Sequence, residues 1–361
     1  MLLSIRKIIQ KPKSKIKKYI NYLDRYKSSK FFRSYYYQNR GKNINYAKNI
    51  WRKNKYWDFY YQSLPHSEKS QYYVPYDFYD IEIEPIYNNG VSSIFANEKN
   101  YYDKLFRDSG VIMPETIFRC INNVCLDKFY RAISDIESCI NNIKQDIIIK
   151  QSFGSGGGYR VQKYYYNHEK NILENNGIVF NVNEYYNLMN GNFIVQEVVQ
   201  QHEGMGKFHP WSLNTIRIIT YRSFQTNNVH TLGQTMRMGV KKSVVDNASS
   251  GGIAVGISDD GTLMKYAVRQ HGDYYTEHPD TNVVFEGSVI PAFNEVQETA
   301  KRLADFIPHQ RLIGWDFAIG IEVKPVLIEL NVGVGIWMHQ FILGKPFFGE
   351  YWKEVYEYLN K

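Results

Sequence analysis

Near its carboxyl end the chain reads Gly314-Trp315-Asp316-Phe317-Ala318-Ile319 and, a few residues on, Val326-Leu327-Ile328-Glu329-Leu330-Asn331. Both stretches alternate apolar with polar or small residues, which predicts half-buried strands, and residues 320–324 between them predict a turn. Residues two apart on a strand face the same side, so Glu329 and Asn331 project together, and antiparallel pairing would bring Asp316 to that face. Two carboxylates and an amide are hard oxygen donors that suit Mg²⁺. The alternative is that they are ordinary polar residues at strand ends.

Length and composition indicate a folded chain of more than one domain or lobe. The chain has 361 residues, among them 31 Tyr and 20 Phe, enough to bury a large core. No apolar run approaches the ~20 residues of a membrane span, and the opening apolar segment is too short for a secretory signal. Cys120, Cys125 and Cys139 are an odd number without Cys-x-x-Cys spacing. We therefore expect free thiols and a cytoplasmic protein.

The positive charge is concentrated at the amino terminus. Residues 1–55 hold 17 Lys and Arg against one acidic residue, a balance of +16, so the rest of the chain carries −8. Apolar residues recur at helical spacing there, which predicts a basic helical arm. Such an arm could bind an anionic membrane surface, at the inner face of the membrane, or nucleic acid. The simpler alternative is a composition biased to Lys, Asn, Tyr and Ile.

A glycine-rich loop lies between two predicted strands. A β-branched run ends at Lys150, the loop Gly154-Ser155-Gly156-Gly157-Gly158 follows, and alternation resumes at residues 159–163. Glycines let backbone N–H groups approach phosphates closely. The spacing matches neither a Walker A loop nor a Rossmann turn. A hairpin over a nucleotide and a plain flexible hairpin both fit.

Further segments place candidate binding groups on strands. Residues 192–199 predict a strand that runs into a polar loop, a natural hinge whose backbone could meet an adenine edge. Two more alternating segments put Arg217 and Arg237 on a sheet surface. Lys104 lies on a charged helix predicted to end at Gly110, and by itself is a helix-surface lysine. No nucleophile elbow or kinase His-Arg-Asp loop is visible.

In their order and spacing these segments resemble the ATP-grasp superfamily over about residues 97–335. The group they resemble most is the sugar-transfer-associated ATP-grasp family, found with exopolysaccharide and capsule genes and related to alpha-L-glutamate ligases. The resemblance is carried by Lys104, Lys150, Gln196-Glu197-Val198-Val199, Ser212-Leu213-Asn214-Thr215-Ile216-Arg217, Arg237-Met238-Gly239, Asp246-Asn247, Gly251-Gly252, His278-Pro279, Gly314-Trp315-Asp316 and Glu329-Leu330-Asn331.

The resemblance implies an α+β, ATP-grasp fold, in which two lobes with antiparallel sheets grip ATP. We expect a basic, aromatic helical extension with its connection over residues 1–95 and an amino-terminal lobe with the glycine-rich lid over 96–200. A carboxyl-terminal lobe with the magnesium site and a last helix would cover 201–361.

The resemblance also implies roles for single residues. Lys104 and Lys150 would neutralise ATP phosphates beneath the loop Gly154, Ser155, Gly156, Gly157 and Gly158. The hinge residues Gln196, Glu197, Val198 and Val199 would meet the adenine. Asp316, Glu329 and Asn331 would hold Mg²⁺, while Arg217, Arg237 and Lys150 would serve catalysis.

The implied activity is an ATP- and Mg²⁺-dependent carboxylate–amine ligase that works through an acyl phosphate. Its substrates would be a small-molecule or glycan-linked carboxylate, such as a sugar acid, and an amine or amino acid, in capsular or exopolysaccharide biosynthesis. The same resemblance implies a polysaccharide-assembly partner that residues 1–55 could contact. D-Ala-D-Ala-ligase-like members carry an arginine two residues before the metal aspartate, whereas this chain has Gly314. Two alternatives therefore stay open: an ATP-grasp kinase that phosphorylates a hydroxyl, and a nucleotide-binding scaffold that docks through the basic arm.

Overall fold

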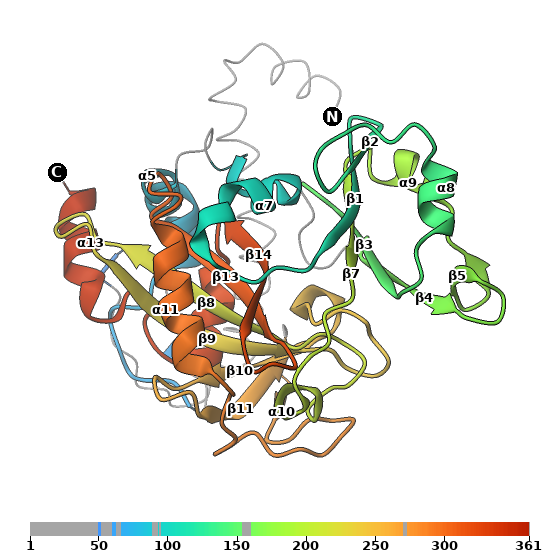
Figure 1. Ribbon diagram of the computed structural model, residues 1–361. Coiled ribbons are helices and arrows are strands. Elements are labelled where there is room, and N and C mark those ends of the chain that lie inside the picture. Colours follow the sequence, from blue (N-terminus) through green and yellow to red (C-terminus); the bar gives the residue numbers. More distant parts are fainter. Residues whose placement is uncertain are drawn as a thin grey trace, which may run out of the picture. The chain divides into compact units, whose positions relative to one another are not determined.

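The computed structural model describes residues 50–51, 60–62, 66–88, 93, 95–153, 160–269 and 273–360 (Figure 1). The chain divides into two compact units, of which one is Glu84–Leu343 and the other combines Met1–Ile83 with Gly344–Lys361. Two of the predictions, the helical arm and the glycine loop at residues 154–158, lie outside the described residues, apart from Ile50 and Trp51 in the arm.

The unit Glu84–Leu343 contains two antiparallel sheets. In the first, seven described strands lie in the order β2-β1-β7-β3-β4-β5-β6. Their bounds are β1 Thr116–Ile121, β2 Val124–Asp127, β3 Ile147–Gln151, β4 Gln162–Asn167, β5 Ile172–Asn175, β6 Ile178–Val179 and β7 Phe193–Glu197. Helices α8 (Ile136–Asn141) and α9 (Val182–Leu188) accompany this sheet, and its core includes Phe118, Ile149, Tyr185 and Phe193. This sheet falls within the predicted amino-terminal lobe.

The second sheet likewise has seven described strands, in the order β12-β11-β10-β9-β8-β13-β14. Their bounds are β8 Thr215–Arg222, β9 Val229–Met238, β10 Ile253–Ile257, β11 Leu263–Arg269, β12 Tyr274–Tyr275, β13 Leu312–Ile319 and β14 Pro325–Val332. Helix α11 (Phe293–Ala304) lies against this sheet (Figure 1). Its Val296, Ala300 and Leu303 side chains belong to the core that holds Trp315. The predicted α+β fold with two antiparallel sheets is confirmed.

Short helical turns precede the first sheet. A 3₁₀ turn (Lys99–Tyr101) leads into α7 (Tyr102–Leu105), and Gly110 adopts a left-handed conformation with φ of 70° after them. The hydroxyl of Tyr102 donates to the Leu330 carbonyl and accepts from the Leu330 amide, which ties these turns to β14. The long helix predicted before Gly110 is therefore a series of single turns. Helices α10 (Glu203–Gly206) and α12 (Ile336–Leu343) lie in the same unit.

The other unit is rich in aromatic contacts. Its described helices are α4 (Tyr76–Phe78), a π-helix (Tyr79–Ile83) and α13 (Trp352–Leu359). The rings of Tyr72 and Trp352 stack with centroids 4.4 Å apart, and the Trp51 ring lies 5.7 Å from that of Tyr356. Helix α13 therefore contributes aromatic side chains to this unit's aromatic contacts.

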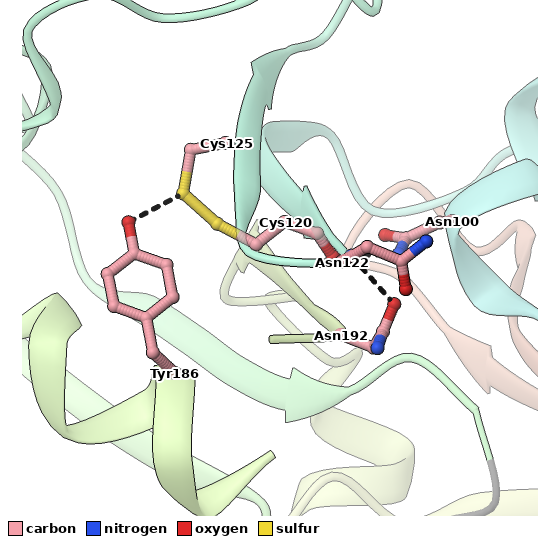
Figure 2. Close-up of a disulfide and its surroundings, with 6 residues drawn as sticks. All are labelled: Asn100, Cys120, Asn122, Cys125, Tyr186 and Asn192. Carbon is pink, nitrogen blue, oxygen red and sulfur yellow. Dashed lines mark hydrogen bonds between the residues drawn. A yellow bond between two sulfur atoms is a disulfide. The ribbon is translucent and has the colours of Figure 1, made fainter. Parts of the chain in front are cut away.

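The expectation of three free thiols is wrong, because Cys120 and Cys125 form a disulfide (Figure 2). Asn122 and Asn123 both have positive φ, and they close a two-residue hairpin between β1 and β2. The hairpin places the two cysteines directly opposite each other, with Cα atoms 4.1 Å apart. Cys139 remains free.

Candidate active site

The two carboxyl-terminal segments form strands, as predicted, and these strands pair with each other. β13 and β14 run antiparallel with Asp316 opposite Glu329 and Gly314 opposite Asn331, and the Gly320 amide donates to the Lys324 carbonyl to close the turn. The Asn331 amide nitrogen donates to Asp316 at 3.2 Å and to Glu329 at 3.4 Å. The three predicted metal-binding side chains therefore form one hydrogen-bonded group.

Two arginines surround Asp316, which is buried. Arg217 lies opposite it on β8 and donates from Nε to Oδ1 at 2.7 Å and from a terminal nitrogen to Oδ2 at 2.5 Å. Arg237 on β9 bridges two carboxylates, Asp316 and Asp246, at 3.1 Å each. Burial acts to lower the pKa of Arg217, but the Asp316 charge outweighs it, and the net shift is upward. Arg217 therefore stays charged and holds Asp316 in place.

Asp246 is a buried carboxylate in the loop after β9. It accepts a hydrogen bond from the Thr215 hydroxyl as well as from Arg237. Burial raises its pKa, and the positive charge of Arg237 opposes that shift. Asp246 thereby fixes the guanidinium of Arg237, one of the groups that face the pocket described below.

Two lysines approach Glu329 from the first sheet and the turn that precedes it. Lys99 Nζ lies 3.2 Å from Glu329 Oε2, and Lys150 is buried near the end of β3. Burial, helped by the neighbouring Lys99 charge, lowers the pKa of Lys150 to about 8, although Glu329 acts to raise it. Burial acts to raise the pKa of Glu329, but Lys99 and Lys150 together hold it well below its usual range. Glu329 is therefore an ionised carboxylate.

These charged groups lie at one cavity of about 420 Å³, lined by residues of both sheets. That volume is within the range of small-molecule sites. Its charged lining residues include Lys99, Lys150, Arg237, Asp246, Asp316 and Glu329. Its apolar lining includes Ile148, Val161, Val198, Val199, Leu213 and Ile328. A pocket with an apolar lining and both lysines and carboxylates suits a ligand with an apolar ring and several negative charges.

The predicted site residues that the structure describes fall into three groups. Gln196, Glu197, Val198, Val199, Lys150, Arg237, Asp316 and Glu329 line the cavity. Arg217 and Asn331 do not line the cavity, but they contact Asp316, which does. Lys104 does not line it: its Nζ lies 3.5 Å from the centroid of the Tyr130 ring.

The residue that sequence reasoning missed is Lys99. It lies five positions before Lys104 in the same charged segment, and the resemblance gave the phosphate-binding role to Lys104 instead. The 3₁₀ turn begins with the Glu98 side chain accepting from the Asn100 amide, and Lys99 is 7% exposed. The Lys99 amide donates to the Ser152 carbonyl, and the Asn100 side chain donates to the Cys120 carbonyl (both cysteines and Asn100 are drawn in Figure 2). These bonds fix the Lys99 backbone against the first sheet.

His209 and Ser212 form a contact that resembles part of a catalytic triad but is structural. The His209 Nδ1 atom lies 2.7 Å from the Ser212 hydroxyl, and its Nε2 atom lies 2.7 Å from the Lys241 carbonyl. Ser212 is 2% exposed, and its hydroxyl oxygen also accepts from the Gly239 amide. The pair therefore holds two pocket-lining loops together and presents no nucleophile.

The donor set around Asp316 fits Mg²⁺. An amide binds a cation through its oxygen, and in this structure the Asn331 nitrogen faces the two carboxylates, so the amide would turn over to join them as a ligand. Within the described part of the chain, no group of three or more His, Cys, Asp or Glu side chains could hold a metal ion. Two carboxylates and one amide are a small set, which suits a cation that keeps waters and phosphate oxygens as its other ligands.

A family model for sugar-transfer associated ATP-grasp proteins matches residues 79–353 of this chain. The match covers both sheets and every predicted site residue. The chain therefore belongs to the sugar-transfer associated ATP-grasp family. No curated protein sequence matches it.

Solved structures of ATP-grasp proteins are similar to this chain at low identity. The ATP-grasp ligase PsnB complexed with a minimal precursor is 14% identical over 75% of this chain and 63% of its own, with a TM-score of 0.41. D-alanine–D-alanine ligase from Bacillus anthracis is 12% identical over 69% and 60%, with a TM-score of 0.36. N5-carboxyaminoimidazole ribonucleotide synthetase from Thermotoga maritima is 9% identical over 66% and 42%, with a TM-score of 0.34. The chain thus spans less than two thirds of each of these proteins.

Proposed function

We propose that the protein is an ATP- and Mg²⁺-dependent carboxylate–amine ligase. The observation that carries this proposal is the joining of Lys99 and Lys150 to Asp316 and Glu329 at the cavity that the hinge residues also line. The lysines can bind the phosphates of a metal–polyphosphate complex, and the pair of carboxylates can bind its metal ion. Family membership supports the same activity.

The nucleotide would bind between the two sheets. Lys150 and Lys99 neutralise the phosphates, with Lys99 taking the role first given to Lys104. The backbone of Gln196 to Val199 meets the adenine, and Ile328 with Val161 contributes to the apolar surface around it. The loop at residues 154–158 is proposed as the lid from its sequence alone.

Asp316, Glu329 and Asn331 would hold the Mg²⁺. When bound, Mg²⁺ neutralises charge on the phosphates during transfer. Arg217 holds the Asp316 carboxylate in one orientation through two hydrogen bonds. We therefore assign Arg217 a positioning role. We assign Arg237 to the substrate side of the site.

The reaction proceeds in two displacements. A substrate carboxylate oxygen attacks the terminal phosphorus of ATP, the bond from that phosphorus to the ADP oxygen breaks, and an acyl phosphate and ADP form. The amine then attacks the acyl carbon, phosphate leaves, and the ammonium loses a proton. Positive side chains that are already in place lower the barrier by stabilising the charge that develops. Arg237, fixed by Asp246, supplies that charge on the acyl side.

We propose a sugar acid as the carboxylate and an amino acid or amine as the second substrate. The description of the family, sugar-transfer associated, supports a role in capsular or exopolysaccharide synthesis. Trp211 lines the cavity and is 46% exposed. An exposed indole face offers a surface on which the apolar face of a sugar ring can pack.

The test is ADP release from purified protein with ATP, Mg²⁺ and pools of sugar acids and amines. Release that requires both an acid and an amine, and that Lys150→Ala abolishes, supports the ligase. Release that never exceeds that of Lys150→Ala contradicts it.

One observation favours a kinase as the second candidate. Gly314 lies opposite Asn331 and carries no side chain, whereas D-Ala-D-Ala-ligase-like members carry an arginine at this position. Without that arginine the acyl-transfer half depends on Arg237. A stable phosphorylated product formed without an amine would establish the kinase and exclude the ligase.

We propose a separate docking role for the basic arm, residues 1–55, on the strength of its charge. Within the described residues, the helices are too short or too polar to cross a membrane. Deletion of residues 1–55 should release the protein from anionic lipid vesicles while ATP turnover continues. Unchanged vesicle binding by the truncated chain would contradict this role.

A further inference from the structure

Glu329 is held by a lysine at the position where it is needed as a metal ligand. Lys99 Nζ lies 3.2 Å from Glu329 Oε2, and the Asn331 amide nitrogen lies 3.4 Å from Oε1. The side chain of Lys99 is 7% exposed and that of Glu329 is 22% exposed. Both oxygens of this carboxylate therefore have a hydrogen-bonding or ionic partner before any metal arrives.

The surrounding charges favour an anion over a cation. In the part of the chain that the structure describes, four cationic side chains meet three carboxylates here, a balance of +1. The cations are Lys99, Lys150, Arg217 and Arg237, and the carboxylates are Asp246, Asp316 and Glu329. A bare divalent cation is repelled by this balance, whereas a polyphosphate is attracted.

Lys99 can change partners more simply than either of the two arginines. Arg217 makes two hydrogen bonds to Asp316, and Arg237 joins two carboxylates. Lys99 forms an ion pair with Glu329, and its ammonium is a compact charge on a flexible stem. Its backbone stays fixed through the Ser152 carbonyl, so the side chain can move without the turn that carries it.

We propose that Lys99 couples metal binding to nucleotide binding by holding Glu329 until phosphates draw its ammonium away. The proposal rests on the nucleotide site proposed above. A divalent cation then binds together with the nucleotide and not before it. Because binding free energies are linked, the metal and the nucleotide must each raise the other's affinity by the same factor. The metal does so by taking Glu329, which releases Lys99 to the phosphates.

The test measures the affinity of nucleotide-free protein for Mn²⁺, a paramagnetic substitute for Mg²⁺. Electron paramagnetic resonance reports the binding. Replacing Lys99 by Met removes the competitor for Glu329, so Lys99→Met should bind Mn²⁺ about tenfold more tightly than wild type, within the usual range of coupling between sites. Lys99→Arg keeps the charge and should bind as weakly as wild type. Lys104→Met, in which the lost lysine contacts Tyr130 instead, should also match wild type.

Two outcomes overturn the proposal. One is a Lys99→Met protein that binds Mn²⁺ no more tightly than wild type. The other is a Lys99→Met, Glu329→Gln double variant that retains the gain, because the new ligand would then not be Glu329. Lys99→Gln provides a second variant if the methionine disturbs folding, which thermal unfolding will detect. Failure of wild type to bind an ATP analogue would instead overturn the proposed function, so the two failures are distinguishable.

Discussion

Arg217 and Asp316 lie directly opposite each other on β8 and β13 and are joined by hydrogen bonds of 2.7 and 2.5 Å. Neighbouring strands therefore supply both a buried carboxylate and the cation that compensates it. The pair fixes the orientation of a carboxylate that we expect to bind Mg²⁺. A metal ligand held this way is ready for its role before the metal arrives.

Arg217→Met should lower the free energy of unfolding by about 3 kcal/mol, since removing one partner of a buried ion pair leaves the other charge poorly compensated. Urea denaturation measures this effect. The matched control is Lys170→Met, which removes a pair in which Lys170 is 60% exposed, and should cost less than about 1 kcal/mol. An Arg217→Met protein as stable as the control would show that Arg237 alone compensates Asp316.

Nucleotide affinity should fall as the pH rises above 8. Burial lowers the pKa of Lys150 to about 8 from its ordinary 10.5, so the lysine loses its charge in mildly alkaline solution. Below that pH Lys150 is protonated and attracts phosphates, and above it affinity should drop by up to about tenfold per pH unit.

Calorimetric titrations of an ATP analogue at pH 7, 8 and 9 measure this dependence. In Lys150→Arg the guanidinium stays protonated, so affinity should vary much less over the same range. Equal pH slopes in wild type and Lys150→Arg would assign the titration to another group.

Replacing both Cys120 and Cys125 by alanine should cost about 2 kcal/mol of stability, the contribution expected from cross-linking a loop of this short length. Urea denaturation with and without a reductant measures it. Reductant should destabilise wild type and Cys139→Ala alike and leave the double alanine variant unchanged. Mass spectrometry after alkylation should find one modified cysteine, Cys139, in the oxidised protein; three modified cysteines would contradict the disulfide.

Much of the site could be predicted because its residues lie on strongly patterned strands. Alternation predicted β13 and β14 as strands, and a period of two placed Glu329 and Asn331 on one face. The antiparallel pairing of the two strands then puts Asp316 opposite Glu329. A strand that ends in a polar loop indicated the hinge residues Glu197 and Val199. Both residues line the cavity.

The rest depends on contacts that local pattern does not specify. Lys99 and Lys104 lie in one charged segment, and only the 3₁₀ turn, fixed by bonds to Ser152 and Cys120, directs Lys99 inward. The disulfide likewise depends on a two-residue turn, for which the adjacent Asn122 and Asn123 were an unused signal.

A further limit concerns long-range ion pairs. Arg217 and Asp316 are 99 positions apart, and only the placement of β8 next to β13 brings them together. Sequence therefore indicated that Arg217 lies on a sheet surface without indicating that it holds a metal ligand.

The most direct test of the central claim is calorimetric titration of a non-hydrolysable ATP analogue into wild type and Glu329→Ala, each with and without Mg²⁺. We predict that Mg²⁺ tightens binding to wild type by about tenfold or more, and that this effect disappears in the variant because the metal loses a carboxylate ligand. Absence of binding to folded wild-type protein, or an undiminished Mg²⁺ effect in Glu329→Ala, would contradict the assignment of this site.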